Sequence, residues 1–241
     1  MEKIVIFGAT GGIGSATAKK LSDHGYDLHL AARNQDKLAA LADELGASYT
    51  AGDVEEPEFF IRVADDAGDK VGGLIYAVGT LNLKSIARLT PEEMQRDFRI
   101  NALGAALAVQ SLLPALKNAQ NPASIVLFSS VAVLQGFKMH TSISMAKGAV
   151  HGLTMALAAE LSPKVRVNAI APSLTQTPMT AGMLSNEKMT EAIAKMHAVP
   201  RLGNAEDMAA LAAFLISEKS GWITGQVFGV DGGRSTLRIN S

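Results

Sequence analysis

Short apolar runs alternate along the chain with longer stretches in which apolar residues recur every three or four positions. The runs cover residues 3–7, 27–31, 48–51, 73–77, 124–128, 165–169 and 227–230, and their lengths favour strands. Between them, Leu38, Leu41 and Leu45 show the spacing of one helix face. Strands separated by helices of ten or more residues are typical of βαβ units. The pattern therefore predicts an α/β fold, with a central parallel sheet of about seven strands and helices on both faces.

Composition narrows the class of protein. The chain has 241 residues, of which 48% are apolar and 19% charged, which suits one domain over residues 1–241. A net charge of −1 argues against a nucleic-acid partner and against an electrostatic membrane anchor. Cysteine is absent, which excludes disulfides, thiolate nucleophiles and cysteine-ligated metals, and we expect no metal site.

The most apolar parts of the chain do not indicate a membrane protein. Residues 1–7 lead directly into an apolar run, without a cleavage site. Residues 101–116 are the most apolar stretch, but Gln110, Ser111 and Pro114 interrupt it and it is too short to span a bilayer. We therefore expect a cytoplasmic protein.

The segment GATGGIG at positions 8–14 follows the first predicted strand and opens the first predicted helix. Glycines permit a tight turn and let the backbone approach a pyrophosphate closely. The start of the helix then offers unpaired N–H groups and the positive end of its dipole. A phosphate-binding turn is one interpretation, and a purely structural glycine-rich turn is the other.

The spacing of Gly8, Gly12 and Gly14 resembles that of the short-chain dehydrogenase/reductase (SDR) family. The resemblance extends over essentially the whole chain, in the family's order and spacing. It is carried by GDV at 52–54, INA at 100–102, SS at 129–130, SMAK at 144–147, VRVNAIAP at 165–172, TGQ at 224–226 and VDGG at 230–233. It implies a single NAD(P)-binding domain of the doubly wound Rossmann type, with its site at the carboxyl ends of the strands. It also implies a homo-oligomer, a tetramer or a dimer, packed through the helices after Pro91 and Thr141.

The same resemblance implies roles for individual residues. Ser130 would hold the oxygen of a small-molecule substrate, Lys147 would position the nicotinamide ribose and lend positive charge, and Asn101 would support a bound water. The implied contacts of the cofactor are Gly8, Thr10, Gly12, Ile13, Gly14, Arg33, Asp53, Val54, Ala77, Gly79, Lys147, Pro172, Thr175 and Thr177.

The residues after the second predicted strand favour NADP(H) as the cofactor. An acidic residue there would accept a hydrogen bond from a ribose 2′-hydroxyl and would repel a 2′-phosphate. Here Ala32 takes that place and Arg33 follows. Because a guanidinium pairs bidentately with phosphate, we predict NADP(H), with NAD(H) as the alternative. A solvated surface side chain is the other interpretation of Arg33.

One departure from the family affects the chemistry. Family members place a tyrosine four residues before the lysine, where it transfers the proton at the substrate oxygen, and here that position is Ile143. Ile143 and Lys147 still share a helix face at i, i+4, but isoleucine cannot transfer a proton. Three interpretations follow.

In the first interpretation, His140 donates the proton. It lies seven residues before Lys147, about two helical turns, and an imidazole titrates near neutrality, which suits a general acid. The segment 140–147 resembles that of the enoyl-acyl-carrier-protein reductases, a divergent branch of the family with its tyrosine at this position. In the second, Ser130, Lys147 and a water near Asn101 form a relay. That relay suits an activated C=C bond, because the resulting enolate needs mainly an electrostatic cradle.

In the third interpretation, the protein binds NADP(H) without catalysis, as a sensor, scaffold or partner subunit. The presence of Ser130, Lys147 and Asn101 together counts against it. The sequence therefore predicts an NADP(H)-dependent oxidoreductase. It would transfer a hydride to a small or medium apolar carbonyl or enoyl compound, with a non-standard proton donor.

Residues 173–201 form the longest irregular stretch and predict a substrate-binding lid. Its methionine-rich apolar positions indicate either a flexible apolar pocket or a core-facing amphipathic helix. His197 and Arg201, at its end, are candidates for contact with an anionic substrate group. Elsewhere, Tyr76 is a candidate displaced proton donor, with simple packing as the favoured alternative.

Overall fold

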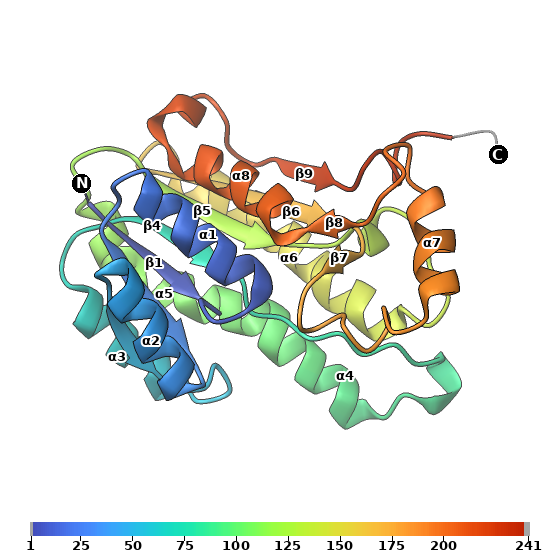
Figure 1. Ribbon diagram of the computed structural model, residues 1–241. Coiled ribbons are helices and arrows are strands. Elements are labelled where there is room, and N and C mark those ends of the chain that lie inside the picture. The colour runs from blue at the N-terminus through green and yellow to red at the C-terminus, as the bar shows by residue number, and fades with distance from the viewer. Residues whose placement is uncertain (1, 239–241) are drawn as a thin grey trace.

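The computed structural model describes residues 2–238 and contains one large parallel sheet (Figure 1). Its seven strands stand in the order β3-β2-β1-β4-β5-β6-β9, and every neighbouring pair is parallel. They are β1 (Lys3–Phe7), β2 (Leu28–Ala32), β3 (Ser48–Ala51), β4 (Val71–Tyr76), β5 (Ala123–Phe128), β6 (Val165–Pro172) and β9 (Val227–Val230). The strand order reverses between β1 and β4, so a crevice opens at their carboxyl ends. The predicted doubly wound α/β fold is confirmed.

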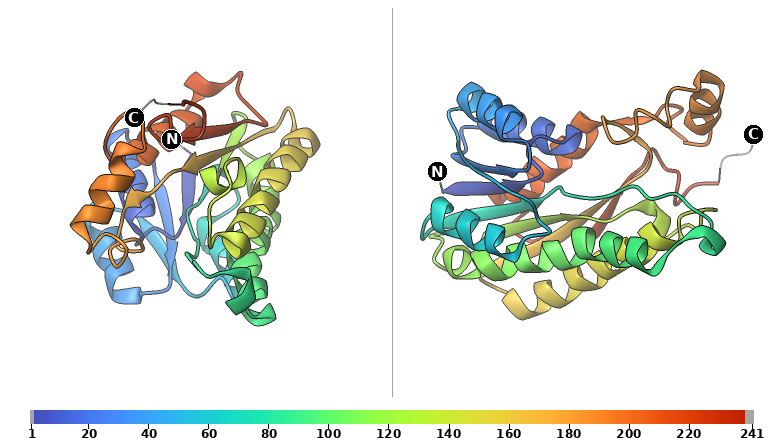
Figure 2. Two further views of the ribbon diagram at one scale, coloured as in Figure 1. Left: turned by 90° about the vertical axis from the view of Figure 1, so that its right-hand side faces the viewer. Right: turned by 90° about the horizontal axis from the view of Figure 1, so that it is seen from below.

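Helices cover both faces of the sheet (Figure 2). One face carries α1 (Gly12–Asp23), α2 (Gln35–Leu45) and α8 (Ala205–Ile216), and the other carries α3 (Pro57–Ala67), α5 (Gly104–Lys117) and α6 (Thr141–Leu161). Strand β1 contributes side chains to both apolar cores, since Ile4 and Ile6 pack on the first face while Val5 and Phe7 pack on the second. This alternation follows from the two-residue period of a strand.

Local signals in the sequence determine where several helices begin. Helix α4 (Pro91–Phe98) starts after Thr90, which forms a capping box with Glu93, and has proline in its first turn. Helix α8 starts with the same arrangement between Asn204 and Asp207. Helix α1 differs, because no side chain caps its first turn and no acidic residue lies there. Its N-terminal end is therefore open to an anion.

Two small strands and some strand ends differ from the expectation. Strand β4 begins at Val71 rather than at residue 73, and β6 continues to Pro172 rather than ending at residue 169. The strands β7 (Thr175–Gln176) and β8 (Gly203–Asn204) pair in parallel and tie the two ends of the predicted lid together. Two residues are too few for a periodic signal, so a sequence pattern cannot predict them.

The predicted lid contains one helix, α7 (Glu187–Lys195), which stands beyond the end to which β6 and β9 point (Figure 1). None of its residues is buried, and Met189 is 41% exposed. The hypothesis of a core-facing helix in this stretch is therefore wrong.

A π-helical turn at Arg99–Leu103 joins α4 to α5. Two side chains bind carbonyls in this turn or just before it. Asn101 Nδ2 donates to the carbonyl of Asp97, near the end of α4, over 2.8 Å, and the Tyr76 hydroxyl donates to the carbonyl of Ile100 over 2.7 Å. The helix from Pro91 to Lys117 is long and apolar enough to cross a membrane, but half of its most apolar window is buried inside the fold. Such burial is typical of a core helix.

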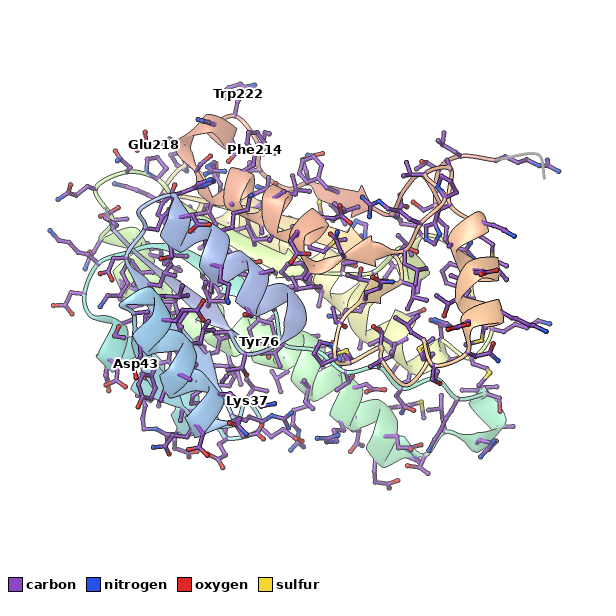
Figure 3. All side chains as sticks on the ribbon, viewed as in Figure 1. Lys37, Asp43, Tyr76, Phe214, Glu218 and Trp222 are labelled. Atoms are coloured by element: carbon purple, nitrogen blue, oxygen red, sulfur yellow. The ribbon has the colours of Figure 1, made fainter. Side chains whose placement is uncertain are left out.

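Tyr76 lies in the interior (Figure 3) and is only 2% exposed. Replacing it with phenylalanine leaves the Ile100 carbonyl without its donor, and a buried unsatisfied acceptor costs about 1–3 kcal/mol. Tyr76→Phe is therefore expected to lower the free energy of unfolding by about that amount in urea titrations. The matched control is Tyr49→Phe, since Tyr49 is 39% exposed. Equal stabilities for the two variants would show that the hydrogen bond to the π-turn contributes nothing.

Candidate active site

The glycine turn after β1 packs backbone against backbone. Gly8 has a φ of 78°, and a Cβ on it would lie 2.9 Å from the backbone of Ala77. A Cβ on Gly14 would lie 2.1 Å from the Gly8 carbonyl oxygen. Only glycine fits either position, and the turn presents the uncapped start of α1 to the crevice between β1 and β4.

A cavity of about 570 Å³ lies beside this turn. Among the predicted cofactor contacts, it is lined by Gly8, Thr10, Arg33, Val54, Ala77 and Gly79. Gly12, Ile13 and Gly14 form the first turn of α1 next to it. The cavity wall at the ends of β2 and β3 is completed by Ala32, Asn34, Gly52 and Phe59. The predicted contacts from the first half of the chain thus converge on one open space.

Arg33 and Asp53 face each other at the edge of this cavity. Arg33 Nη1 lies 3.7 Å from Asp53 Oδ2, and the Arg33 side chain is 69% exposed. Asp53 Oδ1 accepts a hydrogen bond from the Glu55 amide over 3.0 Å. Because an exposed ion pair this long is weak, the Arg33 guanidinium keeps donors free for another anion.

The loop that follows β6 reaches over the glycine turn. A Cβ on Gly12 would lie 2.8 Å from Thr177 Cγ2, and Met179 lines the cavity. Thr175 is turned inward, where its hydroxyl donates to the carbonyl of Ser173. Of the predicted contacts Pro172, Thr175 and Thr177, it is Thr177 that touches the glycine turn.

Lys147 is buried on α6. Its ammonium donates to the carbonyl of Phe128 at the end of β5 over 2.8 Å, and its own main-chain carbonyl accepts from the Ser129 hydroxyl. No carboxylate within residues 2–238 forms an ion pair with it. Burial lowers the pKa of Lys147 to about 8, because an ammonium loses its hydration there.

Asn101 meets Lys147 at Gly79. A Cβ on Gly79 would lie 3.0 Å from Asn101 Oδ1 and 3.3 Å from Lys147 Nζ. Gly79 follows β4 and also lines the cavity. Three separate elements, the end of β4, the π-turn and α6, therefore bring an amide oxygen and an ammonium to Gly79, which itself lines the cavity.

Ser130 lies directly after Ser129, beyond the end of β5. Its Oγ accepts from the Ala132 amide over 3.2 Å, so the hydroxyl hydrogen stays free to donate within the described part of the chain. Ile143, in the first turn of α6, is 4% exposed. The position four residues before Lys147 is thus an apolar, buried side chain without proton chemistry.

His140 lies directly before α6. Its Nδ1 is 2.7 Å from the carbonyl of Lys138, which leaves Nε2 as the ring nitrogen available to exchange a proton. Its ring lies 5.3 Å from that of Phe137, and the Arg234 guanidinium lies 5.2 Å from the same phenyl ring. These contacts hold the imidazole on the segment between β5 and α6, and none of them joins it to Ser130, Lys147 or Asn101.

The other candidates are bound to protein groups instead. Tyr76 is held by the Ile100 carbonyl, and burial raises its pKa, so packing is its role and the displaced-donor hypothesis is not supported. His197 is buried, with Nε2 2.9 Å from Ser173 Oγ. Arg201 binds Asp207 through both terminal nitrogens, over 2.6 and 2.8 Å. Both ring nitrogens of His197 thus face protein groups, and the charge of Arg201 is paired with that of Asp207.

Sequence reasoning missed three polar residues around Asn101, namely Thr80, Asp97 and Ser142. They form one buried hydrogen-bonded group. The only local signal was the i, i+4 spacing of Asp97 and Asn101, which does not reveal that a helical aspartate faces inward.

Comparisons with known proteins agree with this geometry. The family model described as "Enoyl-(Acyl carrier protein) reductase" matches residues 8–235. The chain is 31% identical to an L-2,3-butanediol dehydrogenase from Corynebacterium glutamicum, over 97% of this chain and 98% of that protein. It is 33% identical to a 3-oxoacyl-[acyl-carrier-protein] reductase from Bos taurus, again over 97% and 98%.

Solved structures give the same result. A short-chain type dehydrogenase/reductase from Mycobacterium ulcerans superposes with a TM-score of 0.92 at 27% identity, covering 98% of this chain and 90% of that one. A structure from Brucella melitensis, titled as a short-chain dehydrogenase/reductase and glucose/ribitol dehydrogenase, gives 0.91 at 28% identity, with 98% and 97% covered. The chain belongs to the short-chain dehydrogenase/reductase family and is an oxidoreductase of that type.

Proposed function

We propose that this protein is an NADP(H)-dependent oxidoreductase that reduces a small or medium apolar carbonyl or enoyl compound. The observation that carries the proposal is that the Lys147 ammonium and the Asn101 amide oxygen both lie beside Gly79, a residue that lines the 570 Å³ cavity. A buried charge of this kind is costly and is typical of sites where charge performs chemistry.

The cavity fits a dinucleotide in shape and in charge. The side-chain-free turn at Gly8 and the uncapped start of α1 suit a pyrophosphate, and Arg33 suits a ribose 2′-phosphate. Asp53 and Val54 suit the adenine end, and Pro172, Thr175 and Thr177 the nicotinamide end. When bound, the nicotinamide supplies or accepts the hydride.

The catalytic residues act on the substrate oxygen and its surroundings. Lys147 holds the ribose hydroxyls and lends positive charge where negative charge develops. Ser130 donates its free hydroxyl hydrogen to the substrate oxygen. Asn101 presents its amide oxygen to a water beside Lys147. All three groups are fixed before the substrate arrives, which is the condition for electrostatic catalysis.

Ile143 cannot transfer a proton, so another group must do so, and we assign this role to His140. Its Nδ1 hydrogen stays on the Lys138 carbonyl, so the imidazolium form gives up its second proton from Nε2 and returns to the neutral Nδ1–H tautomer. A water relay through Ser130 and Lys147 is the alternative route. An α,β-unsaturated substrate suits this site better than a ketone, because protonation at its oxygen is less demanding.

The remaining features of the proposal concern the whole chain. Residues 173–201 act as a lid over the substrate side of the single domain, residues 1–241. The exposed Phe98, Leu103 and Met145 line a groove of about 510 Å³, which suits a homo-oligomer packed through α4 and α6, a tetramer or a dimer. A monomer mass in sedimentation at micromolar concentration would contradict this oligomeric arrangement.

We also propose a cytoplasmic location, and fractionation of the source cells tests it.

The activity is tested by following NADPH oxidation against matched pairs, each a ketone and its α,β-unsaturated counterpart, with carrier-linked thioesters included. Turnover of the unsaturated members is expected. His140→Ala should then lower kcat at least tenfold, with the NADPH Kd within twofold of wild type, because His140 supplies the proton and not cofactor affinity. An unchanged kcat would remove the assignment, and tight NADPH binding without turnover of any pair would indicate a non-catalytic binder.

The cofactor preference is tested at Arg33. Charge-assisted hydrogen bonds contribute about 1.5–3 kcal/mol, so Arg33→Ala should raise the NADPH Kd about 10- to 100-fold, with the NADH Kd within twofold of wild type. Lys37→Ala removes a charge from the nearby surface of α2 (Figure 3) and serves as the control for long-range electrostatics. Equal loss of NADPH and NADH affinity on replacing Arg33 would show that it does not read the 2′-phosphate.

A further inference from the structure

A buried carboxylate lies behind the catalytic groups. Asp97 is the last but one residue of α4 and is 3% exposed. Its Oδ1 accepts from the Thr80 hydroxyl over 2.6 Å, and its Oδ2 accepts from the Ser142 hydroxyl. No cation within residues 2–238 forms an ion pair with it. A buried carboxylate held only by hydroxyls is costly, and the fold alone does not explain its presence.

The donor and acceptor of each hydrogen bond at the Thr80 hydroxyl can be assigned. An ionised carboxylate only accepts, so the single hydroxyl hydrogen of Thr80 points to Asp97. The Thr80 oxygen can then only accept, and it does so from Asn101 Nδ2 over 2.8 Å. The second Nδ2 hydrogen of Asn101 goes to the Asp97 main-chain carbonyl over 2.8 Å.

These hydrogen bonds determine which way the Asn101 side-chain amide is turned. With both N–H groups directed to Thr80 and to the π-turn, Oδ1 is left facing the Thr80 amide, 3.4 Å away, and Gly79. That is the side on which Lys147 Nζ lies. A free Thr80 hydroxyl could instead donate to the amide oxygen, and this competition is what the carboxylate prevents.

The second carboxylate oxygen of Asp97 accepts its hydrogen bond from the helix that carries Lys147. Ser142 is fully buried in the first turn of α6, five residues before Lys147 and directly before Ile143. One carboxylate therefore bridges the segment that holds Asn101 to the helix that holds Lys147. Hydrogen bonds to a charged acceptor are about twice as strong as neutral ones, so the bridge is stiff.

We propose that Asp97 is a positioning residue of the active site. Through Thr80 it fixes the Asn101 amide, and through Ser142 it fixes the start of α6, so that Asn101 Oδ1 and Lys147 Nζ meet at Gly79. Its structural part stands on the hydrogen bonds alone, and its catalytic consequence rests on the proposed oxidoreductase function.

The structural part is tested by NMR on protein labelled with ¹⁵N-asparagine, with the Asn101 side-chain pair assigned by its loss in Asn101→Ala. In the wild type this pair should be protected from solvent exchange. Asp97→Asn and Thr80→Val should both shift the pair and speed its exchange at least tenfold, whereas Thr80→Ser, which keeps the hydroxyl, should preserve it. Asp66→Asn is the control, since Asp66 also accepts from a threonine hydroxyl, Thr50, but away from the site. An unchanged pair in Thr80→Val overturns the proposal, even if Asp97→Asn fails to fold.

The catalytic consequence of the proposal is tested with whichever ketone or α,β-unsaturated compound the wild type reduces. Asp97→Asn and Thr80→Val should each lower kcat about tenfold, the equivalent of one lost hydrogen bond in the transition state, with the NADPH Kd within twofold of wild type. Thr80→Ser should restore kcat. In an Asn101→Ala background, Thr80→Val should lower kcat by less than twofold further, because Thr80 acts through Asn101.

A tenfold additional loss from Thr80→Val in that background would overturn the positioning role, since Thr80 would then act independently of Asn101. If the wild type oxidises no NADPH with any compound, the proposed function fails, and the NMR comparison alone decides whether Asp97 positions Asn101.

Discussion

The burial of the Lys147 ammonium is the constraint on which the rest of the site depends. Removing a charge from water costs several kcal/mol even after relaxation. Lys147 is 8% exposed, and within residues 2–238 its ammonium has only the Phe128 carbonyl as a hydrogen-bond partner. The surrounding structure offsets this cost with a fixed dipole, the Phe128 carbonyl at the end of β5, rather than with an opposite charge in contact. The Asn101 amide oxygen lies beside the same glycine as the ammonium, Gly79. The ammonium is therefore polarising and close to its titration range near neutral pH.

The fold brings these dipoles together because a parallel sheet collects the ends of its strands at one edge. Gly79 after β4, Ser130 after β5 and the start of α6 all reach that edge. Asn101 comes from a helix, and it faces inward because the π-turn rotates this part of the helix relative to an unbroken α-helix. The hydrogen bond from Tyr76 to the Ile100 carbonyl and the one from Asn101 to the Asp97 main-chain carbonyl hold the turn in that form.

Much of this arrangement could be predicted from the sequence, because it depends on patterns that repeat or on residues without a side chain. The strands followed from apolar runs, and the glycine turn followed from the spacing of Gly8 and Gly14. The buried bridge through Asp97 could not be predicted, since an aspartate in a polar helix such as α4 normally faces solvent and only tertiary packing turns it inward. The strands β7 and β8 were too short for a periodic signal. Helix α7, with four apolar residues, does not face the core, although its apolar spacing indicated this as one possibility.

The most direct test of the account replaces Lys147 with methionine, which has a similar volume and no charge. Lys147→Met should abolish NADPH oxidation while leaving the free energy of unfolding unchanged or higher, because it removes the desolvation cost of a buried ammonium. Both readouts come from the same protein preparation, with urea titration for stability and NADPH absorbance for activity. A variant that loses more than about 2 kcal/mol of stability and still oxidises NADPH at the wild-type rate would show that Lys147 serves the fold and not the chemistry.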